Sequence, residues 1–106
     1  MTTLIELRNA LRQFAAARDW DRFHSPKNLA MALSVEAAEL LEHFQWITEE
    51  HSSNLEEREL EKVGEEMADV LLYLIRLADK LDLDLLQAAA RKMQLNAVKY
   101  PTKEPR

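Results

Sequence analysis

The chain has 106 residues, of which 31% are charged, a net charge of −5 and no cysteine. This length favours one domain over residues 1–106, and the missing thiols exclude disulfides, thiolate metal sites and a cysteine nucleophile. The acidic balance argues against a protein that binds nucleic acid. No apolar run approaches the roughly 20 residues of a membrane span, and the first residues are not a typical apolar leader, so we expect a cytoplasmic protein without membrane contact.

Four helices are predicted, because strong helix formers dominate and the chain has only one glycine and three prolines. Ser25 followed by Pro26 is a typical helix start, and Asp84 is a suitable cap for the last helix. The polar stretch between the second and third predicted helices is expected to be a loop, and the last residues, 101–106, to be frayed. The predicted helices cover residues 3–18, 26–46, 55–81 and 84–100.

Residues 67–78, MADVLLYLIRLA, are apolar almost all the way round a helix. Such a helix must be covered on every side, and a chain of this size buries a limited share of its surface by itself. We therefore expect an all-α fold whose helical bundle is completed by oligomerisation, most simply in a symmetric dimer.

Two pairs of carboxylates interrupt the apolar faces of the second and third predicted helices. Glu36 and Glu39 lie three residues apart in EAAELLEHFQW, and Glu66 and Asp69 repeat this spacing in EEMADVLLYLIRLAD. At about 100° per residue, each pair points one way and falls on a mostly apolar arc. A single E-x-x-E motif is common on solvated surfaces. Two copies on consecutive apolar arcs instead predict that the two helices pack antiparallel with their acids facing.

Four converging carboxylates repel one another, so a buried cluster of them needs a compensating charge. Lys62 is the nearest cation to Glu66 and is one charge for four acids. All-oxygen ligation suits Mg²⁺ or Mn²⁺, whereas zinc is a poor fit to a chain with no cysteine and three histidines. A ferritin-like di-iron site would need Glu-x-x-His on these helices. The predicted metal ligands are Glu36, Glu39, Glu66 and Asp69.

These acidic segments resemble those of the MazG-like all-α nucleoside triphosphate pyrophosphohydrolases, in particular the branch that includes dCTP pyrophosphatases. That branch also carries a W..FH.P.NL segment and an N..KYP ending. In this chain residues 20–29 read WDRFHSPKNL, and residues 96–101 read NAVKYP. The resemblance extends from about Leu4 to Pro101, which is nearly the whole chain.

The resemblance implies a four-helix MazG-like bundle, assembled as a homodimer or homotetramer. It implies hydrolysis of (deoxy)nucleoside triphosphates, such as dCTP or modified pyrimidine dNTPs, to a monophosphate and pyrophosphate as house-cleaning of the nucleotide pool. It also implies that the four predicted metal ligands are catalytic, holding Mg²⁺ that the triphosphate bridges. The residues it suggests on the base and sugar side are Trp20, His24, Asn28, Trp46 and Tyr73. Those it suggests at the phosphates or sugar, of the same or of a neighbouring subunit, are Asn96, Lys99 and Tyr100.

Two other interpretations stay open. The chain could be a related all-α pyrophosphohydrolase that acts on another nucleotide, such as dUTP or phosphoribosyl-ATP, because base choice depends on the shape of the pocket. It could also be a non-enzymatic helical interaction module, which would explain the apolar third helix but not the acids. Trp46 and Tyr73 are also compatible with a simple core role. Trp20 and His24 lie in a charged, loop-like segment, which favours contact with a ligand.

Overall fold

The computed structural model describes residues 1–103, and over this range the regular structure is entirely helical. The elements are α1 (Leu4–Ala17), the 3-10 helix η1 (Asp21–Phe23), α2 (Pro26–Glu42), α3 (Glu49–Ser52), α4 (Glu57–Lys80) and α5 (Leu85–Lys99). The all-α prediction and the four long helices are therefore confirmed. Within the described range, no helix combines the length and the apolar character needed to cross a membrane.

The structure differs from the prediction around the second helix and the loop after it. α2 ends at Glu42 rather than at Trp46, because the chain then tightens into turns in which the Phe44 and Ile47 N–H groups donate to carbonyls three residues back. The expected loop contains the short helix α3, whose first turn is capped by the Thr48 hydroxyl. Of the expected frayed end, residues 101–103 form no helix, and residues 104–106 lie outside the described residues.

Each long helix begins at a residue whose side chain satisfies backbone N–H groups of the first turn. Side-chain oxygens of Thr3, Ser25 and Asp84 accept hydrogen bonds from the N–H three residues further on. α4 begins with a reciprocal capping box between Glu56 and Glu59. Caps of this kind contribute on the order of 1 kcal/mol each. The caps at Ser25 and Asp84 are those that the sequence predicted.

α1 and α4 both end in a reversal built on an aspartate in the left-handed region. Asp19 and Asp82 each have a φ of 55°, a conformation that aspartate tolerates better than most residues with a side chain. In both reversals the residue after the aspartate donates its N–H to the carbonyl five residues back, at 2.9 Å. The first reversal brings Trp20 and η1 back towards α4, and the second leads into α5.

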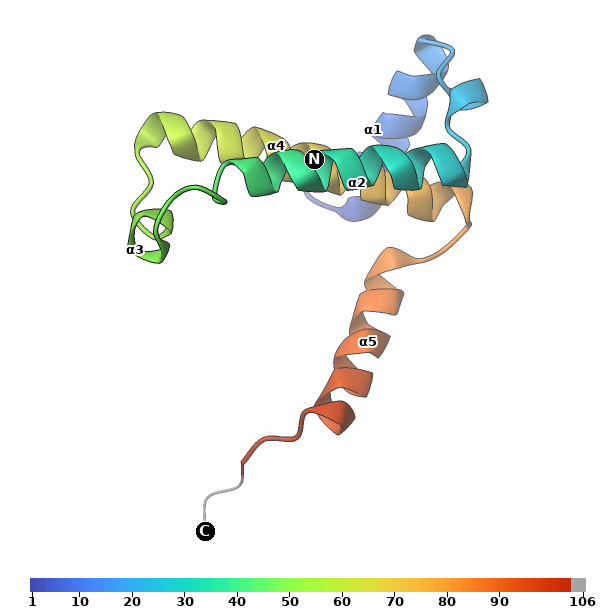
Figure 1. Cartoon of the computed structure of the whole chain (residues 1–106). Coiled ribbons are helices and arrows are strands. Elements are labelled where there is room, and N and C mark those ends of the chain that lie inside the picture. Colours follow the sequence, from blue (N-terminus) through green and yellow to red (C-terminus); the bar gives the residue numbers. More distant parts are fainter. Residues whose placement is uncertain (104–106) are drawn as a thin grey trace.

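α2 and α4 lie side by side and run antiparallel, and α1 packs against α4 (Figure 1). The predicted antiparallel packing of the two acid-bearing helices is therefore confirmed. Few apolar residues are buried within residues 1–103 of a single chain: Ala15 of α1, Leu29 of α2, and Val63, Ile75 and Ala78 of α4.

Charged contacts fasten α1 and η1 to the C-terminal half of α4. Arg12 of α1 holds Asp79 through two N–H groups, at 2.7 and 2.5 Å. Asp21 of η1 accepts hydrogen bonds through Oδ1 from Arg76 at 2.6 Å and from Lys80 at 3.0 Å. The pKa of Asp79 is lowered chiefly by its bond to Arg12, and the pKa of Asp21 chiefly by its bond to Arg76. These bonds are charge-assisted and fix where η1 lies on α4.

α5 projects away from the other helices and makes few contacts with them (Figure 1). The radius of gyration is 17.2 Å, whereas a compact domain of about 100 residues has about 13 Å. A bundle of four helices is therefore not closed within one chain. The large apolar side chains that α5 leaves exposed are Leu86, Met93, Leu95 and Val98, and α4 adds Leu60, Met67 and Leu71.

Candidate metal and nucleotide site

Three of the four predicted metal ligands meet between α2 and α4. One carboxylate oxygen of each of Glu36, Glu39 and Glu66 lies within 4.8 Å of the other two. The first two are neighbours one turn apart on α2, and the third faces them from α4. All three side chains are half-buried. The sequence predicted this juxtaposition from the repeated three-residue spacing.

The charge of this cluster has no protein partner. Glu36 Oε2 and Glu66 Oε2 are buried and accept no hydrogen bond. Within residues 1–103, no lysine, arginine or histidine forms an ion pair with the three glutamates, and Lys62 is exposed. A buried polar atom without a partner costs on the order of 1–3 kcal/mol, and more when it is charged. The cluster is therefore unfavourable unless it takes up a proton or a cation.

Burial and the neighbouring carboxylates make the charged form of Glu36 unfavourable. Burial raises the pKa of Glu36 to about 7, with further contributions from its contact with Glu66 and from the charge of Glu39. The donors are all carboxylate oxygens, which are hard ligands suited to Mg²⁺ or Mn²⁺ rather than to a thiophilic metal. The buried unpartnered oxygens and this donor set fit a divalent cation.

Asp69, the fourth predicted ligand, lies one turn beyond Glu66 on the same side of α4. It is not part of the group of three, and it is exposed. Its charge nevertheless helps to raise the pKa of Glu36, and its side chain lines the cavity next to the cluster. Asp69 therefore stands between the acidic cluster and that cavity.

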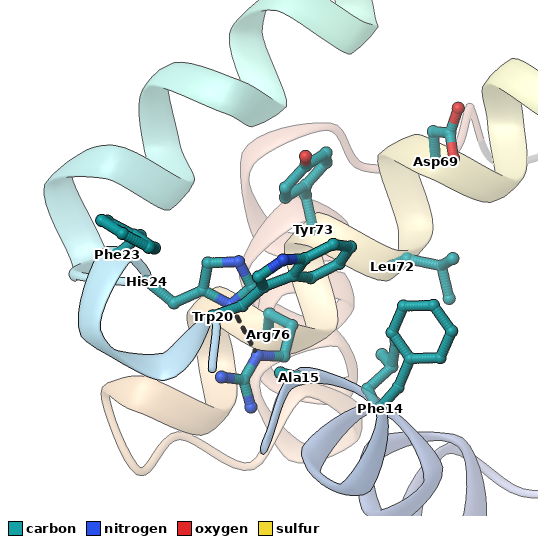
Figure 2. Close-up of a pocket in the computed structure, with 10 residues that line it drawn as sticks. Phe14, Ala15, Trp20, Phe23, His24, Asp69, Leu72, Tyr73 and Arg76 are labelled. Carbon is teal, nitrogen blue, oxygen red and sulfur yellow. Dashed lines mark hydrogen bonds between the residues drawn. The ribbon is translucent and has the colours of Figure 1, made fainter. Parts of the chain in front are cut away.

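A cavity of about 540 Å³ lies between α1, η1 and α4 (Figure 2). Its size, its aromatic and apolar wall and its few polar groups are typical of a small-molecule site. The lining residues are Leu11, Phe14, Ala15, Trp20, Phe23, His24, Asp69, Leu72, Tyr73 and Arg76.

One side of α4 connects the acidic cluster to the cavity. Glu66, Asp69, Tyr73 and Arg76 follow one another at intervals of three, four and three residues, which places them along a single stripe. The rise over these ten residues is about 15 Å. The acidic end faces α2, and the aromatic end faces α1 and η1. With a cation bound at the acids, this stripe would suit a ligand that has an anionic tail and an aromatic head.

Three of the residues predicted for the base side line the cavity: Trp20, His24 and Tyr73. The Trp20 ring packs edge-on against Phe14, with the ring centroids 5.5 Å apart, and its centroid is 6.0 Å from that of His24. Trp20 still keeps 43% of its surface exposed. A large aromatic ring that is packed on one side and open on the other offers a face on which a flat ligand can stack.

The other predicted substrate-binding residues lie outside the cavity. The Asn28 amide donates to the Phe23 carbonyl at 2.9 Å, so it fastens η1 to the start of α2. Trp46 is 86% exposed in the turns after α2. Asn96, Lys99 and Tyr100 lie at the end of α5, and within one chain they do not line the cavity.

Sequence reasoning missed six residues of the cavity wall, namely Leu11, Phe14, Ala15, Phe23, Leu72 and Arg76. The sequence does contain a feature from which Arg76 could have been predicted. It is the one basic residue in the apolar run 67–78, and it follows Tyr73 by three residues on the same face. The two phenylalanines had no such signal, because the reversal at Asp19 and the packing of α1 on α4 bring them to the cavity.

The chain belongs to the MazG-like family, because the model of that family matches residues 31–106. It is also 44% identical to dCTP pyrophosphatase 1 of Homo sapiens and 43% identical to that of Bos taurus, in alignments that cover 93% of this chain. The chain spans 59% and 60% of the lengths of these two relatives. A crystal structure of a pyrophosphatase from Archaeoglobus fulgidus is similar with a TM-score of 0.86 at 45% identity, covering 92% of this chain and 91% of that one. The MazG-like fold prediction is thereby confirmed.

The raised pKa of Glu36 predicts a pH-dependent stability of the metal-free protein. The folded state holds a proton that the unfolded chain loses near pH 4.5, so this stabilisation is complete below that pH and is lost as the pH rises through about 7. Glu36→Gln mimics the protonated side chain at every pH. We therefore expect Glu36→Gln to become increasingly more stable than wild type between about pH 5 and about pH 8, in denaturant unfolding with EDTA.

Two comparisons isolate this effect. Burial and the charge of Arg76 lower the pKa of His24, which gives stability an opposite slope in an overlapping pH range. His24 is unchanged in Glu36→Gln, so it cancels in the difference from wild type. Glu42→Gln alters an exposed glutamate on the same helix and should follow wild type. A difference between Glu36→Gln and wild type that does not vary with pH would show that Glu36 is not strained.

Proposed function

We propose that this protein is a Mg²⁺-dependent nucleoside triphosphate pyrophosphohydrolase. Its substrates are dCTP or modified pyrimidine dNTPs, its products are the monophosphate and pyrophosphate, and its role is house-cleaning of the cytoplasmic nucleotide pool. The observation that carries the proposal is the pair of buried, unpartnered oxygens of Glu36 and Glu66 beside an aromatic cavity. The names of the relatives, dCTP pyrophosphatase 1 and a pyrophosphatase, support the choice of reaction and substrate.

The acidic cluster is the proposed metal site. Glu36, Glu39 and Glu66 would hold Mg²⁺ or Mn²⁺, with Asp69 at the edge of the site. When bound, such an ion neutralises charge on the phosphoryl oxygens and activates a water molecule for attack on phosphorus. Without a cation, these same carboxylates would repel a triphosphate, so the protein alone offers no attraction at this end of the stripe.

The proposed role of the cavity is to position the substrate. Trp20 and Tyr73 offer ring faces to the base, while the acids of the same α4 stripe lie towards the polyphosphate. Holding both ends of the substrate along one rigid helix restricts its freedom before reaction, which is a large part of what an enzyme can contribute. Among residues 1–103, no serine, threonine or cysteine lines the cavity, and a water nucleophile needs none.

We further propose that the working form is a homodimer or homotetramer. α5 leaves Met93 and Val98 exposed by 73% and 82%, and α4 leaves Met67 exposed by 57%. Apolar area of this extent on a single chain is typical of an interface between copies. In such an assembly, Asn96, Lys99 and Tyr100 at the end of α5 would be available to a neighbouring cavity, where they meet the phosphates or sugar.

The reaction is tested with a panel of triphosphates. With Mg²⁺, we expect dCTP or a modified pyrimidine dNTP to be cleaved fastest, releasing equimolar monophosphate and pyrophosphate and no inorganic phosphate. The panel should contain dUTP, dTTP, the purine dNTPs, CTP and phosphoribosyl-ATP, with products separated by anion-exchange chromatography. Stepwise release of inorganic phosphate, or no turnover of any member, would sink the proposal.

Replacing Glu39 distinguishes its proposed role as a metal ligand from a role in stability. Glu39→Gln removes one negative charge from a repelling cluster, so the metal-free protein should stay folded or melt slightly higher. The same change should lower kcat/KM for dCTP by about a hundredfold or more, because charge stabilisation by a metal is usually a large catalytic term. Glu42→Gln is the matched control and should keep wild-type activity. If Glu39→Gln melts far below wild type yet turns over normally, Glu39 has a structural role instead.

The assembly is tested by multi-angle light scattering. Because the exposed apolar side chains of α4 and α5 need cover, we expect a mass of two or four times 12.3 kDa at micromolar concentration. Replacing both Met93 and Val98 with glutamate should shift the mass towards one chain. A native mass near 12.3 kDa for the wild type would contradict the proposed assembly.

A further inference from the structure

Arg76 is the one fully buried charged residue among those described, with 5% of its surface exposed. It lies at the cavity end of the α4 stripe, and its guanidinium group has three neighbours. Nη2 donates to Asp21 at 2.6 Å, Nη1 lies 3.8 Å from Asp79, and Nε donates to Nδ1 of His24 at 3.3 Å. Each of its nitrogen atoms thus faces a protein group.

The bond between Arg76 and His24 determines the state of the imidazole. An arginine side chain has only donors and stays protonated, so Nδ1 of His24 must be the acceptor. A histidine that accepts at Nδ1 is neutral and carries its proton on Nε2. The protein thereby leaves His24 with one donor, Nε2–H. Within residues 1–103, Arg76 is the only group that hydrogen-bonds the ring.

The surroundings of His24 favour this neutral form. Burial, and then the positive charge of Arg76, lower the pKa of His24. Of the other charged groups that face the ring, Lys80 acts in the same direction and Asp21 acts against it. The carboxylate of Asp21 is engaged by Arg76 and Lys80, so it is not placed to turn the imidazole into a cation.

His24, which carries this Nε2–H donor, is part of the cavity wall. His24 lines the cavity together with Trp20 and Tyr73, and Figure 2 shows Arg76 bonded at one edge of the ring, with Tyr73 on the opposite side. Apart from Asp69 and Arg76, the polar groups of this wall are those of His24, Trp20 and Tyr73. When a ligand displaces water from this largely apolar site, the donor is left unsatisfied unless the ligand offers an acceptor.

We propose that Arg76 is a positioning residue that holds His24 as an Nε2–H donor, so that the cavity selects a nucleobase with a hydrogen-bond acceptor on its edge. A pyrimidine carbonyl oxygen or an unprotonated ring nitrogen meets this requirement. The inference rests on the proposed function, because it takes the cavity to be the base site. Arg76 does not serve as a phosphate ligand, since its own donors are turned to Asp21, Asp79 and His24.

The state of the ring is measured directly by nitrogen-15 NMR of the histidine side chains at neutral pH, with His24→Gln used to assign the signals. We expect a pyridine-like shift for Nδ1 and a pyrrole-like shift for Nε2 of His24 in wild type. Arg76→Met removes the donor and should bring both shifts towards the averaged values of an exposed histidine. A protonated Nδ1 in wild type, or unchanged shifts in Arg76→Met, would overturn the proposal.

Selectivity is measured with dCTP and with the triphosphate whose base is difluorotoluene, an apolar ring of pyrimidine shape without strong acceptors. Wild type should prefer dCTP by about tenfold or more in kcat/KM, because the isostere leaves the His24 donor unpaired. Arg76→Met should lose most of this preference through a higher KM for dCTP, with kcat changed little. Arg12→Met is the matched control, since it removes an ion pair to Asp79 without touching His24, and it should keep the preference.

The possible outcomes separate the two claims. If wild type turns over no triphosphate, the proposed function fails, and the base-selection claim fails with it. If wild type is active but Arg76→Met keeps the full preference for dCTP, only the inference about Arg76 fails. Should Arg76→Met not fold, His24→Phe removes the same donor and keeps a ring of similar size. It is then expected to lose the preference for dCTP, and a retained preference would overturn the proposal.

Discussion

The structure depends on a repulsive contact, the meeting of Glu36 and Glu66 where α2 and α4 pack together. Two carboxylate oxygens are buried there without a partner among residues 1–103, in the most extensive contact between helices of this range. Burial and mutual charge act against the fold at this point. A protein that only needed a stable bundle would have an apolar pair in these positions. A bound cation would compensate this cost, so the proposed metal site and the helix packing would have one origin.

The aromatic half of the site has a different physical basis. Here opposite charges meet: Arg12 binds Asp79, and Asp21 binds both Arg76 and Lys80. These pairs attach α1 and η1 to α4, and Trp20 and His24 follow from where η1 lies. One face of α4 thus carries unpaired acids at one end and a paired guanidinium at the other. The unpaired end is suited to attract a charged ligand through a metal, and the paired end to hold protein groups still.

A feature could be predicted from the sequence when it depends only on residues that lie close together in the chain. Helix caps and the three-residue spacing of Glu36–Glu39 and Glu66–Asp69 depend on neighbours within one turn, so the helices and the facing acids were predictable. The cavity wall was only half predictable. Phe23 reaches it through the reversal at Asp19, where aspartate takes a conformation usually given to glycine. Phe14 reaches it through the packing of α1 on α4, which no pattern in the chain predicts. The placement of α5 could not be predicted either, because α5 makes few contacts with the other helices of the chain.

The most direct test of the central claim is the binding of Mn²⁺, followed by electron paramagnetic resonance, to metal-free protein with no nucleotide present. If the acidic cluster is a cation site, wild type binds Mn²⁺ and Mg²⁺ competes for it. Glu36→Gln and Glu66→Gln then bind at least about tenfold more weakly, while Glu42→Gln binds like wild type. Equal Mn²⁺ affinity in wild type and both cluster variants would show that the buried carboxylates of α2 and α4 do not form a metal site.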